Sequence, residues 1–491
     1  MARSIDGRAS YQLTFVVLGA GVSTYSLLSS LLFPMLATFA RVLHSSQTDV
    51  TWMFTAFLLS SSISTPILGR LGDMTGKKRM FVLGLISMGI GTLLGAFATS
   101  LGVMIVARVL QGTAGGLLPL AFGIARDEFP PEKVAGTVSA LAALVAVGGG
   151  AGVALAGPID NAFGYRWLFW FPLIITIMAA LAAYLVVPES RKRIPGRISW
   201  TAAFLLSGWL VALLIGISRA PTWGWGSGRV LGLIALAAVG CVGWIVAETR
   251  ARTPLIDMQM MRIRAVWTSN LVALLFGIGI YSVIAFVPGF VETPRSTSYG
   301  FGSSITEAGA ILLPMTLGML FFGLVAGPLG ARCGSRNVVV GGSALSAFSL
   351  LALALKHGAV GTVLVEMSAV GAGFGFAFSG LANLVVAAVP PTQTGVASGM
   401  NANIRTIGGS IGTAFVATII TAGVTHGFPK ASGYTNGFLT LAIALGLATL
   451  AALLIPNPRR DPRTGREPDV ALRHAELAIV PGGTLVGDGP E

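Results

Sequence analysis

Charged side chains are scarce in this sequence. Asp, Glu, Lys and Arg make up only 10% of its 491 residues, whereas 54% of the residues are hydrophobic. A soluble protein carries roughly 25% charged residues, because it must cover its surface with them. The composition therefore excludes an ordinary cytosolic enzyme and a disordered chain, and it indicates a chain whose surroundings are mostly lipid.

Cysteine and histidine are also rare. Cys241 and Cys333 lie in separate apolar segments, and the four histidines have no metal-ligand spacing, so we expect neither a disulfide framework nor a metal site. A membrane-embedded enzyme would need a nucleophile–base pair or metal ligands at one membrane face. No glycine-rich phosphate loop with its lysine is found, so ATP hydrolysis is not indicated. The sequence predicts a protein that is not an enzyme and needs no cofactor.

Long apolar stretches, by contrast, are plentiful. A helix needs about 20 apolar residues to cross roughly 30 Å of hydrocarbon. We predict an all-α polytopic membrane protein with fourteen transmembrane helices. These are expected at about 13–39, 50–69, 80–98, 102–125, 134–157, 167–187, 198–218, 229–247, 265–290, 307–330, 337–355, 358–388, 395–423 and 434–456.

The basic residues are distributed unevenly between the two sides of these spans. If the N-terminus is cytosolic, 23 of the 32 Lys and Arg fall on cytosolic segments and 7 on outer loops. This agrees with the positive-inside rule. We therefore expect both termini in the cytosol and a multi-pass protein of the bacterial inner (plasma) membrane. The placement of basic residues on cytosolic segments explains the net charge of +13 better than nucleic-acid binding does. The lipid bilayer is the expected partner, and the chain is expected to be a monomer.

The two ends of the chain resemble each other. The segment "GRLGDMTGKKR" at 69–79 matches "GPLGARCGSRN" at 327–337, and Gly148-Gly149 matches Gly408-Gly409 at an offset of 260. Parallel repeats of this kind place a substrate path at their interface near the membrane midplane. The predicted organisation is a cytosolic tail at 1–12, a six-helix bundle at 13–188, an inserted helix pair with flanking loops at 189–264, a second bundle at 265–456 and a disordered cytosolic tail at 457–491.

The loop between the second and third spans resembles the signature loop of the major facilitator superfamily, and the whole pattern is most similar to its fourteen-span drug:proton antiporter family. The matching residues are Gly69, Asp73, Gly76, Lys77, Lys78 and Arg79. The resemblance implies the major facilitator fold, with a small-molecule substrate and protons as partners.

Asp73 can cap a neighbouring helix N-terminus or pair with a cation. Such contacts would act as a latch in one rocking state. The alternative is that the basic cluster only sets topology. The second copy has Ala331 in place of Asp73, so the latch is expected on one side only.

The fourth span carries "RVLQGTAGG" at 108–116, which resembles the family's Arg-x-x-Gln-Gly motif. Arg108 and Gln111 lie on one helical face, and the resemblance implies coupling to protons or substrate. Alternatively, Arg108 reaches a membrane interface or only holds the bundle together.

The fifth span resembles the antiporter motif. Gly148, Gly152 and Gly157 have its spacing and Pro158 follows, although Val153 stands at the usual Pro position. Close helix packing is the alternative explanation for these small residues.

The first span lacks the acidic residue that the resemblance would imply as the proton carrier. Relatives often carry an acidic residue about nine positions before the Pro of the first span, where this chain has Tyr25. The best alternative carrier is Glu366 in the twelfth span, because a carboxylate buried there is costly to keep ionised. It could instead lie near the outer interface, or pair with Arg108 or Arg405. Arg405 could balance Glu366, contact an anionic part of the substrate, or be structural.

The sequence as a whole predicts a proton-coupled exporter of lipophilic small molecules, cationic drugs and dyes included, that works by alternating access. Two alternatives stay open: an exporter of a self-made metabolite, lipid or siderophore, and a nutrient importer of the same fold.

Overall fold

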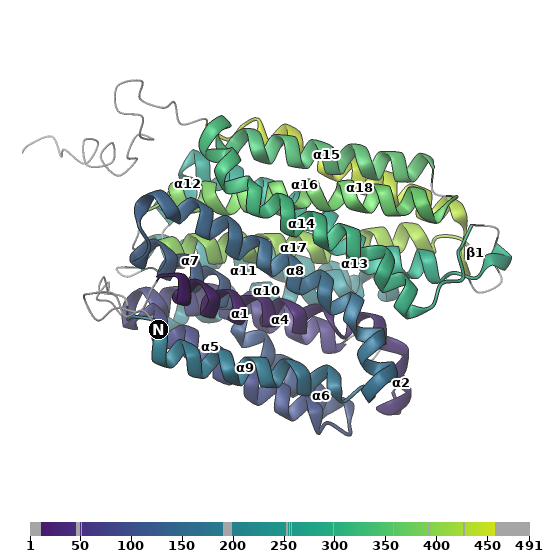
Figure 1. Ribbon diagram of the computed structural model, residues 1–491, viewed down its shortest axis with the longest axis horizontal. Coiled ribbons are helices and arrows are strands. Elements are labelled where there is room, and N and C mark those ends of the chain that lie inside the picture. The colour runs from purple at the N-terminus through teal and green to yellow at the C-terminus, as the bar shows by residue number, and fades with distance from the viewer. Residues whose placement is uncertain are drawn as a thin grey trace, which may run out of the picture.

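Long helices lie side by side along the molecule in the computed structural model (Figure 1). The structure describes residues 11–45, 50, 52–189, 199–251, 254, 256, 258–297, 299–356, 358–390, 393–425 and 428–456. Within them, fourteen helices are long and apolar enough to cross a membrane, which confirms the predicted number. The tail predicted at 457–491, and nearly all of that at 1–12, lies outside the described residues.

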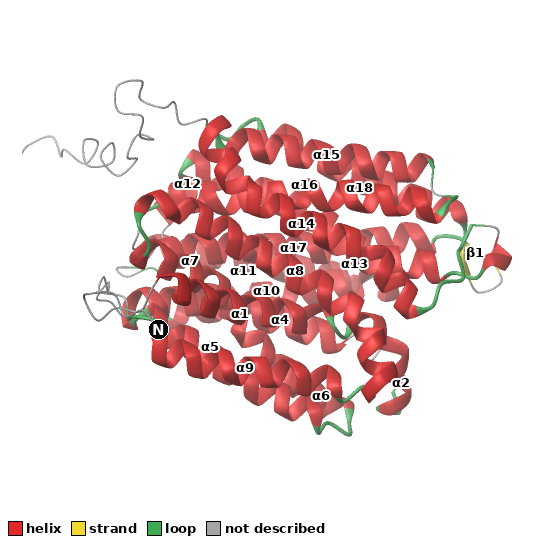
Figure 2. Cartoon of the chain, viewed as in Figure 1, coloured by secondary structure: helices red, strands yellow, loops and turns green. Residues whose placement is uncertain are grey.

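The helices group into an N-terminal half, an inserted pair and a C-terminal half. The N-terminal half comprises α1 (Tyr11–Ser30), α2 (Leu36–Val42), α4 (Trp52–Thr75), α5 (Lys77–Ala96), α6 (Leu101–Gly112), α7 (Leu117–Glu128), α8 (Pro131–Phe163) and α9 (Trp167–Val186). The inserted pair is α10 (Trp200–Trp223) and α11 (Gly228–Arg250), followed by the short α12 (Met258–Arg262). The C-terminal half comprises α13 (Arg264–Glu292), α14 (Ile305–Cys333), α15 (Ser335–Leu355), α16 (Val360–Ala387), α17 (Thr394–Thr421) and α18 (Ala431–Ala452). A two-stranded hairpin, β1 (Val424–Thr425) and β2 (Phe428–Pro429), precedes α18 (Figure 2).

Two of the predicted spans are interrupted. The first passes through a 3₁₀ turn at Phe33–Met35, where Pro34 has no backbone N–H to continue the α-helical pattern. The fourth passes through a 3₁₀ turn at Thr113–Gly116. There, a Cβ on Gly115 would come 2.3 Å from Oγ of Ser61. The absence of a side chain therefore allows this turn to lie directly against α4.

Large apolar side chains cover the outside of the helices. Leu185, Phe348 and Leu355 are 76%, 71% and 79% exposed. Exposure of this kind over many helices would cause a soluble protein to aggregate. It suits helices that satisfy their own backbone hydrogen bonds and contact lipid tails.

The two halves are packed together by two helix pairs. α8 and α14 touch along their length: a Cβ on Gly327 would come 3.1 Å from the Cα of Gly136, and one on Gly309 would come 3.0 Å from the Cα of Ala154. α4 and α17 approach each other most closely where α4 ends, since a Cβ on Gly69 would come 2.9 Å from the carbonyl oxygen of Gly395. We call this end of the molecule, which carries the loop between α4 and α5, the signature-loop end (left in Figure 1).

The inserted pair contacts both halves. α10 packs against α4 and against α17. At the end opposite the signature loop, the guanidinium of Arg219 lies 4.6 Å from the ring centroid of Trp52 in α4. In the α10–α11 connection, Trp225 Nε1 donates a 2.9 Å hydrogen bond to Thr418 Oγ1 in α17. The pair thus bridges the two halves next to the α4–α17 contact.

Candidate functional site

The signature loop folds into a buried ionic cluster. Gly76 connects α4 to α5 with a φ of 122°, a conformation that favours glycine. Lys77 Nζ lies 2.7 Å from an Asp127 carboxylate oxygen and 3.8 Å from Asp73. All three charged side chains are at least nine-tenths buried. Lys77 therefore connects the ends of α4 and α7 within the N-terminal half.

The remaining basic residues of the loop face outward. Lys78 lies 5.7 Å from the ring centroid of Tyr184. Arg79 Nε is 3.5 Å from a carboxylate oxygen of Glu189, and the Arg79 side chain is 64% exposed. Such an exposed pair contributes little to stability, so Asp73 is the charged residue of the predicted loop whose described contacts reach the other half.

Asp73 lies at the N-terminus of a helix in the opposite half. Its two carboxylate oxygens are 3.3 and 3.4 Å from the position that a Cβ on Gly395 would take, in the first turn of α17. Neither oxygen has a hydrogen-bond partner in the described part of the chain. The helix N-terminus carries a partial positive charge that stabilises a carboxylate. The geometry therefore suits the expected cap, whereas the latch role itself stays a prediction.

Arg126, at the end of α7, makes a contact between the halves that the sequence pattern did not predict. Its Nη1 donates to the carbonyl oxygens of Val386 and Val389, at 2.6 and 2.7 Å, and to Thr394 Oγ1 at 2.7 Å. The two carbonyl acceptors lie at and just after the end of α16, where unpaired carbonyls favour a cation, and Thr394 is the first residue of α17. Asn383 Nδ2 adds a 2.7 Å hydrogen bond to Ser139 Oγ of α8. The signature-loop end is therefore closed by polar contacts between the halves.

Arg108 is completely buried inside the N-terminal half. Its Nη1 donates to the carbonyl oxygen of Leu28 at 3.0 Å and to Gln111 Oε1 at 2.8 Å. Its guanidinium lies 4.3 Å from the centroid of Phe57, and Gln111 Nε2 donates to Thr92 Oγ1 at 3.3 Å. Arg108 and Gln111 thus act together, tying α1, α4, α5 and α6 to one another. These contacts suit the bundle-holding role, whereas coupling to protons or substrate stays a prediction.

Tyr25 and Arg405 lie close to the interface between the halves. The Tyr25 hydroxyl is 2.6 Å from Ser61 Oγ, and its ring stacks on Phe57 with centroids 5.5 Å apart. Arg405 lies 4.4 Å from the ring centroid of Phe378. Tyr281 of α13 and Tyr25 are polar groups in the neighbourhood of its guanidinium. The structure therefore places Tyr25 of α1 and Arg405 of α17 in the same region of the interface.

Glu366 is not part of this group. It lies twelve residues before Phe378 on α16, or about 18 Å along the helix axis. Gly373, two turns further on the same face, packs against Ser346 of α15, so Glu366 is directed toward α15. The structure therefore does not pair it with Arg405 or Arg108.

The glycines predicted for the antiporter motif let α8 approach two helices. A Cβ on Gly148 would come 2.3 Å from the Ser23 carbonyl oxygen, and one on Gly152 would come 2.7 Å from that of Leu27, both in α1. A Cβ on Gly157 would come 2.7 Å from Thr306 Oγ1 of α14. Pro158 lies inside α8, which continues to Phe163, six residues beyond its predicted end.

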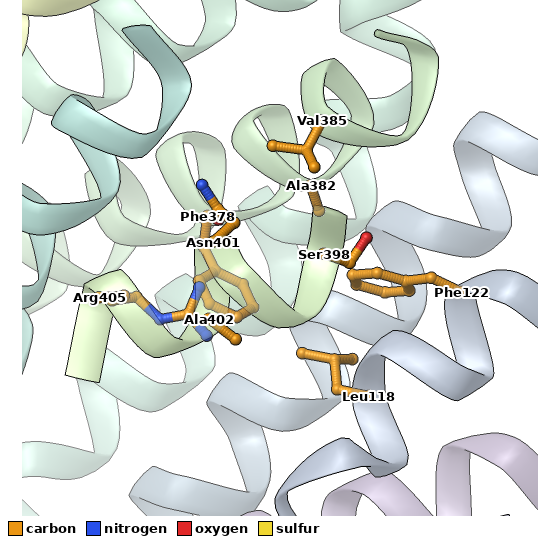
Figure 3. Close-up of a pocket in the computed structure, with 9 residues that line it drawn as sticks. All are labelled: Leu118, Phe122, Phe378, Ala382, Val385, Ser398, Asn401, Ala402 and Arg405. Atoms are coloured by element: carbon orange, nitrogen blue, oxygen red, sulfur yellow. The ribbon is translucent and has the colours of Figure 1, made fainter. Parts of the chain in front are cut away.

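A narrow pocket lies between the halves, bordering the closed signature-loop end (Figure 3). α7 supplies one wall and α16 and α17 supply the others. The lining residues are Leu118, Phe122, Phe378, Ala382, Val385, Ser398, Asn401, Ala402 and Arg405. Phe378 is the phenylalanine of α16 that lines the pocket. Phe374 packs on Phe276 and Phe376 on Phe322, each with ring centroids 5.0 Å apart.

Known proteins share this architecture and sequence pattern. The proton:xylose symporter XylE superposes with a TM-score of 0.65 over 94% of this chain and 98% of its own, at 15% identity. The tetracenomycin C resistance and export protein of Streptomyces glaucescens is 28% identical over 85% of this chain and 77% of its own. Multidrug resistance protein 3 of Bacillus subtilis is 29% identical over 75% of this chain and 72% of its own. The uridine/deoxyuridine transporter of Lactococcus lactis is 27% identical over 93% of this chain and 97% of its own.

The sequence model of the Major Facilitator Superfamily matches residues 18–413 and 270–482. This match covers most of the chain and both helical halves, in agreement with the fourteen spans and the shared fold. The chain therefore belongs to the major facilitator superfamily of membrane transporters, whose members are not in general enzymes.

Proposed function

We propose that this protein is a proton-coupled exporter of lipophilic small molecules in the bacterial inner membrane, with both termini in the cytosol. The observation that carries the proposal is a pocket between the two halves, closed at the signature-loop end by Asp73 and Arg126. A binding site at a repeat interface that is sealed from one side is what alternating access requires.

The packing suggests how the halves move. α8 and α14 touch along their length. In this proposal their contact is kept throughout the cycle, and the two halves rotate about it. The contacts of Asp73 and Arg126 are confined to the signature-loop end, and they must break when that end opens. In this proposal the structure is closed to the cytosol, and breaking the latch admits cargo from the cytosolic side.

Proton coupling needs a carboxyl group that gains and loses a proton during the cycle. Glu366 is our proposed carrier, since it lies six residues into α16, about 9 Å along the helix. A proton that enters from outside and leaves to the cytosol is driven by about 2.3 kcal/mol per 100 mV of membrane potential. Asp73 is the competing carrier, because both its oxygens are buried without a hydrogen-bond partner.

Two related functions differ from drug efflux only in cargo or direction. Similarity to the tetracenomycin C export protein favours export of a self-made metabolite as the nearer alternative. Similarity to the uridine/deoxyuridine transporter favours transport of a nutrient as the second.

Transport into inside-out vesicles tests the proposal. Vesicles from a host that lacks its own pumps, with and without this protein, are energised and supplied with anionic, neutral and cationic lipophilic dyes. We expect uptake of at least one dye that depends on the protein and stops when nigericin and valinomycin collapse the proton gradient. Uptake that is unaffected by the ionophores, or no protein-dependent uptake of any dye, would contradict the proposal.

A further inference from the structure

The pocket between the halves contains a charge with no opposite charge nearby. Arg405 lies eleven residues into α17, about 17 Å along the helix, and its side chain lines the pocket. Within the described residues its guanidinium contacts the Phe378 ring and takes part in no ion pair. A guanidinium stays protonated in proteins, and a cation in this environment costs several kcal/mol unless an anion compensates it.

No acidic side chain of the described spans can supply that anion. Apart from Glu366, which faces α15, every Asp and Glu in these spans lies within about three residues of a helix end. These residues are Asp73, Asp127, Glu128, Glu132, Asp160, Glu248, Glu292 and Glu307. The pocket at mid-depth is therefore positive, which disfavours cationic cargo and favours anionic cargo.

A second pocket residue also lacks a partner. Ser398 is 7% exposed, and its hydroxyl has no hydrogen bond within the described residues. A buried hydroxyl without a partner costs free energy. Ser398 and Arg405 are two helical turns apart on one face of α17, so they are separated by about 10 Å along the axis. Both side chains line the same pocket in Figure 3.

The surface between these two polar groups is apolar. Leu118 and Phe122 of α7 face Phe378, Ala382 and Val385 of α16 across the pocket (Figure 3). Flat aromatic bodies pack well against such walls. Resting on the proposed transport function, we propose that the cargo is an elongated organic anion. The pocket has room for little more than one water molecule in this closed form, so the cargo binds when the halves have parted. Its carboxylate then binds Arg405, its apolar or aromatic body lies against Phe122 and Phe378, and a polar group about 10 Å from the carboxylate bonds Ser398.

Three pyrene probes that differ in charge test this proposal. Pyrenebutyrate is an anion, pyrenebutanol is neutral and pyrenebutyltrimethylammonium is a cation. Binding of each to the purified full-length protein in phosphatidylcholine nanodiscs is measured by fluorescence anisotropy, with empty nanodiscs as the blank. We expect pyrenebutyrate to bind roughly tenfold more tightly than pyrenebutanol, the ratio that one charge-assisted hydrogen bond supplies, and the cation to bind most weakly.

Two variants connect the preference to one side chain. Arg405→Met should remove the preference for pyrenebutyrate, and Arg405→Lys should keep part of it, because a lysine retains the charge but not the planar pair of donors. Arg229→Met, at an exposed position at the start of α11, is the matched control and should keep the full preference. Monodispersity on gel filtration shows whether each variant is folded.

The outcomes separate this inference from the proposed function. Equal binding of the three probes, tighter binding of the cation, or a preference that survives in Arg405→Met would overturn the anionic cargo. Gradient-driven uptake of other dyes could persist in each of those cases. Conversely, an Arg405-dependent preference without any gradient-driven uptake would support the anion site and contradict proton-coupled export.

Discussion

Replacing Arg126 by methionine should open the signature-loop end of the transporter. The change removes hydrogen bonds to Val386, Val389 and Thr394. Hydrogen bonds to charged groups contribute about 1.5–3 kcal/mol each, but water and other partners replace part of that loss when the halves separate. A net loss of about 2–3 kcal/mol is therefore expected, which shifts the ratio of closed to open molecules roughly 30- to 150-fold.

Distances between spin labels at the signature-loop end measure this shift. Glu132, at the start of α8, and Arg264, at the start of α13, are both exposed and belong to opposite halves. Double electron–electron resonance between labels at these positions should give a mostly short distance in the parent protein. A longer distance should become the main population in Arg126→Met.

Two further variants interpret the result. Arg126→Lys retains the positive charge near the carbonyl groups, so it should shift the distance less than Arg126→Met. Arg41→Met changes an exposed arginine at the opposite end and should leave the distance unchanged. If Arg126→Met gives the parent's distance distribution, the gating argument from these contacts is refuted.

Three further substitutions test the remaining parts of the mechanism. Asp73→Asn removes the charge from the N-terminus of α17, an interaction of about 0.3–2 kcal/mol, so cargo transport should be several-fold slower while cargo binding is retained; parent rates would argue against a latch. Glu366→Gln should abolish gradient-driven uptake but preserve exchange of cargo across vesicles without a gradient, and unchanged gradient-driven uptake would place the carrier elsewhere. Gly69→Ala introduces a Cβ 2.9 Å from the Gly395 carbonyl oxygen, so the spin-label distance should lengthen, whereas Gly102→Ala, with no atom within 4 Å, should not change it.

Hydropathy was sufficient to predict the fourteen spans, because each helix must be apolar enough to reside in lipid whatever its neighbours are. The interruption at Gly115 was not predicted. It depends on the close approach of Ser61 from another helix, and hydropathy contains no information about such an approach. The glycine-rich "TAGG" segment at 113–116 was the available signal.

The site was predicted less completely than the fold. Asp73 was found because its loop has a recognisable pattern, and the structure places it at a helix N-terminus as its chemistry suggests. Arg126 was counted only as a topological charge, since its acceptors lie about 260 residues away in the sequence. Glu366 was singled out because it is an acidic residue within an apolar span, but a helix that is apolar on every side does not reveal which face its neighbours cover.

The inserted pair of helices, α10 and α11, has a consequence for the energetics of the proposed transport cycle. Arg219 of this pair contacts Trp52, and Trp225 donates a hydrogen bond to Thr418, so the pair is attached to both halves. If the halves rotate relative to each other as proposed, one of these contacts must break or deform in each cycle and form again. In that mechanism the inserted pair acts as a spring between the halves, and its stiffness contributes to the rate of the conformational change.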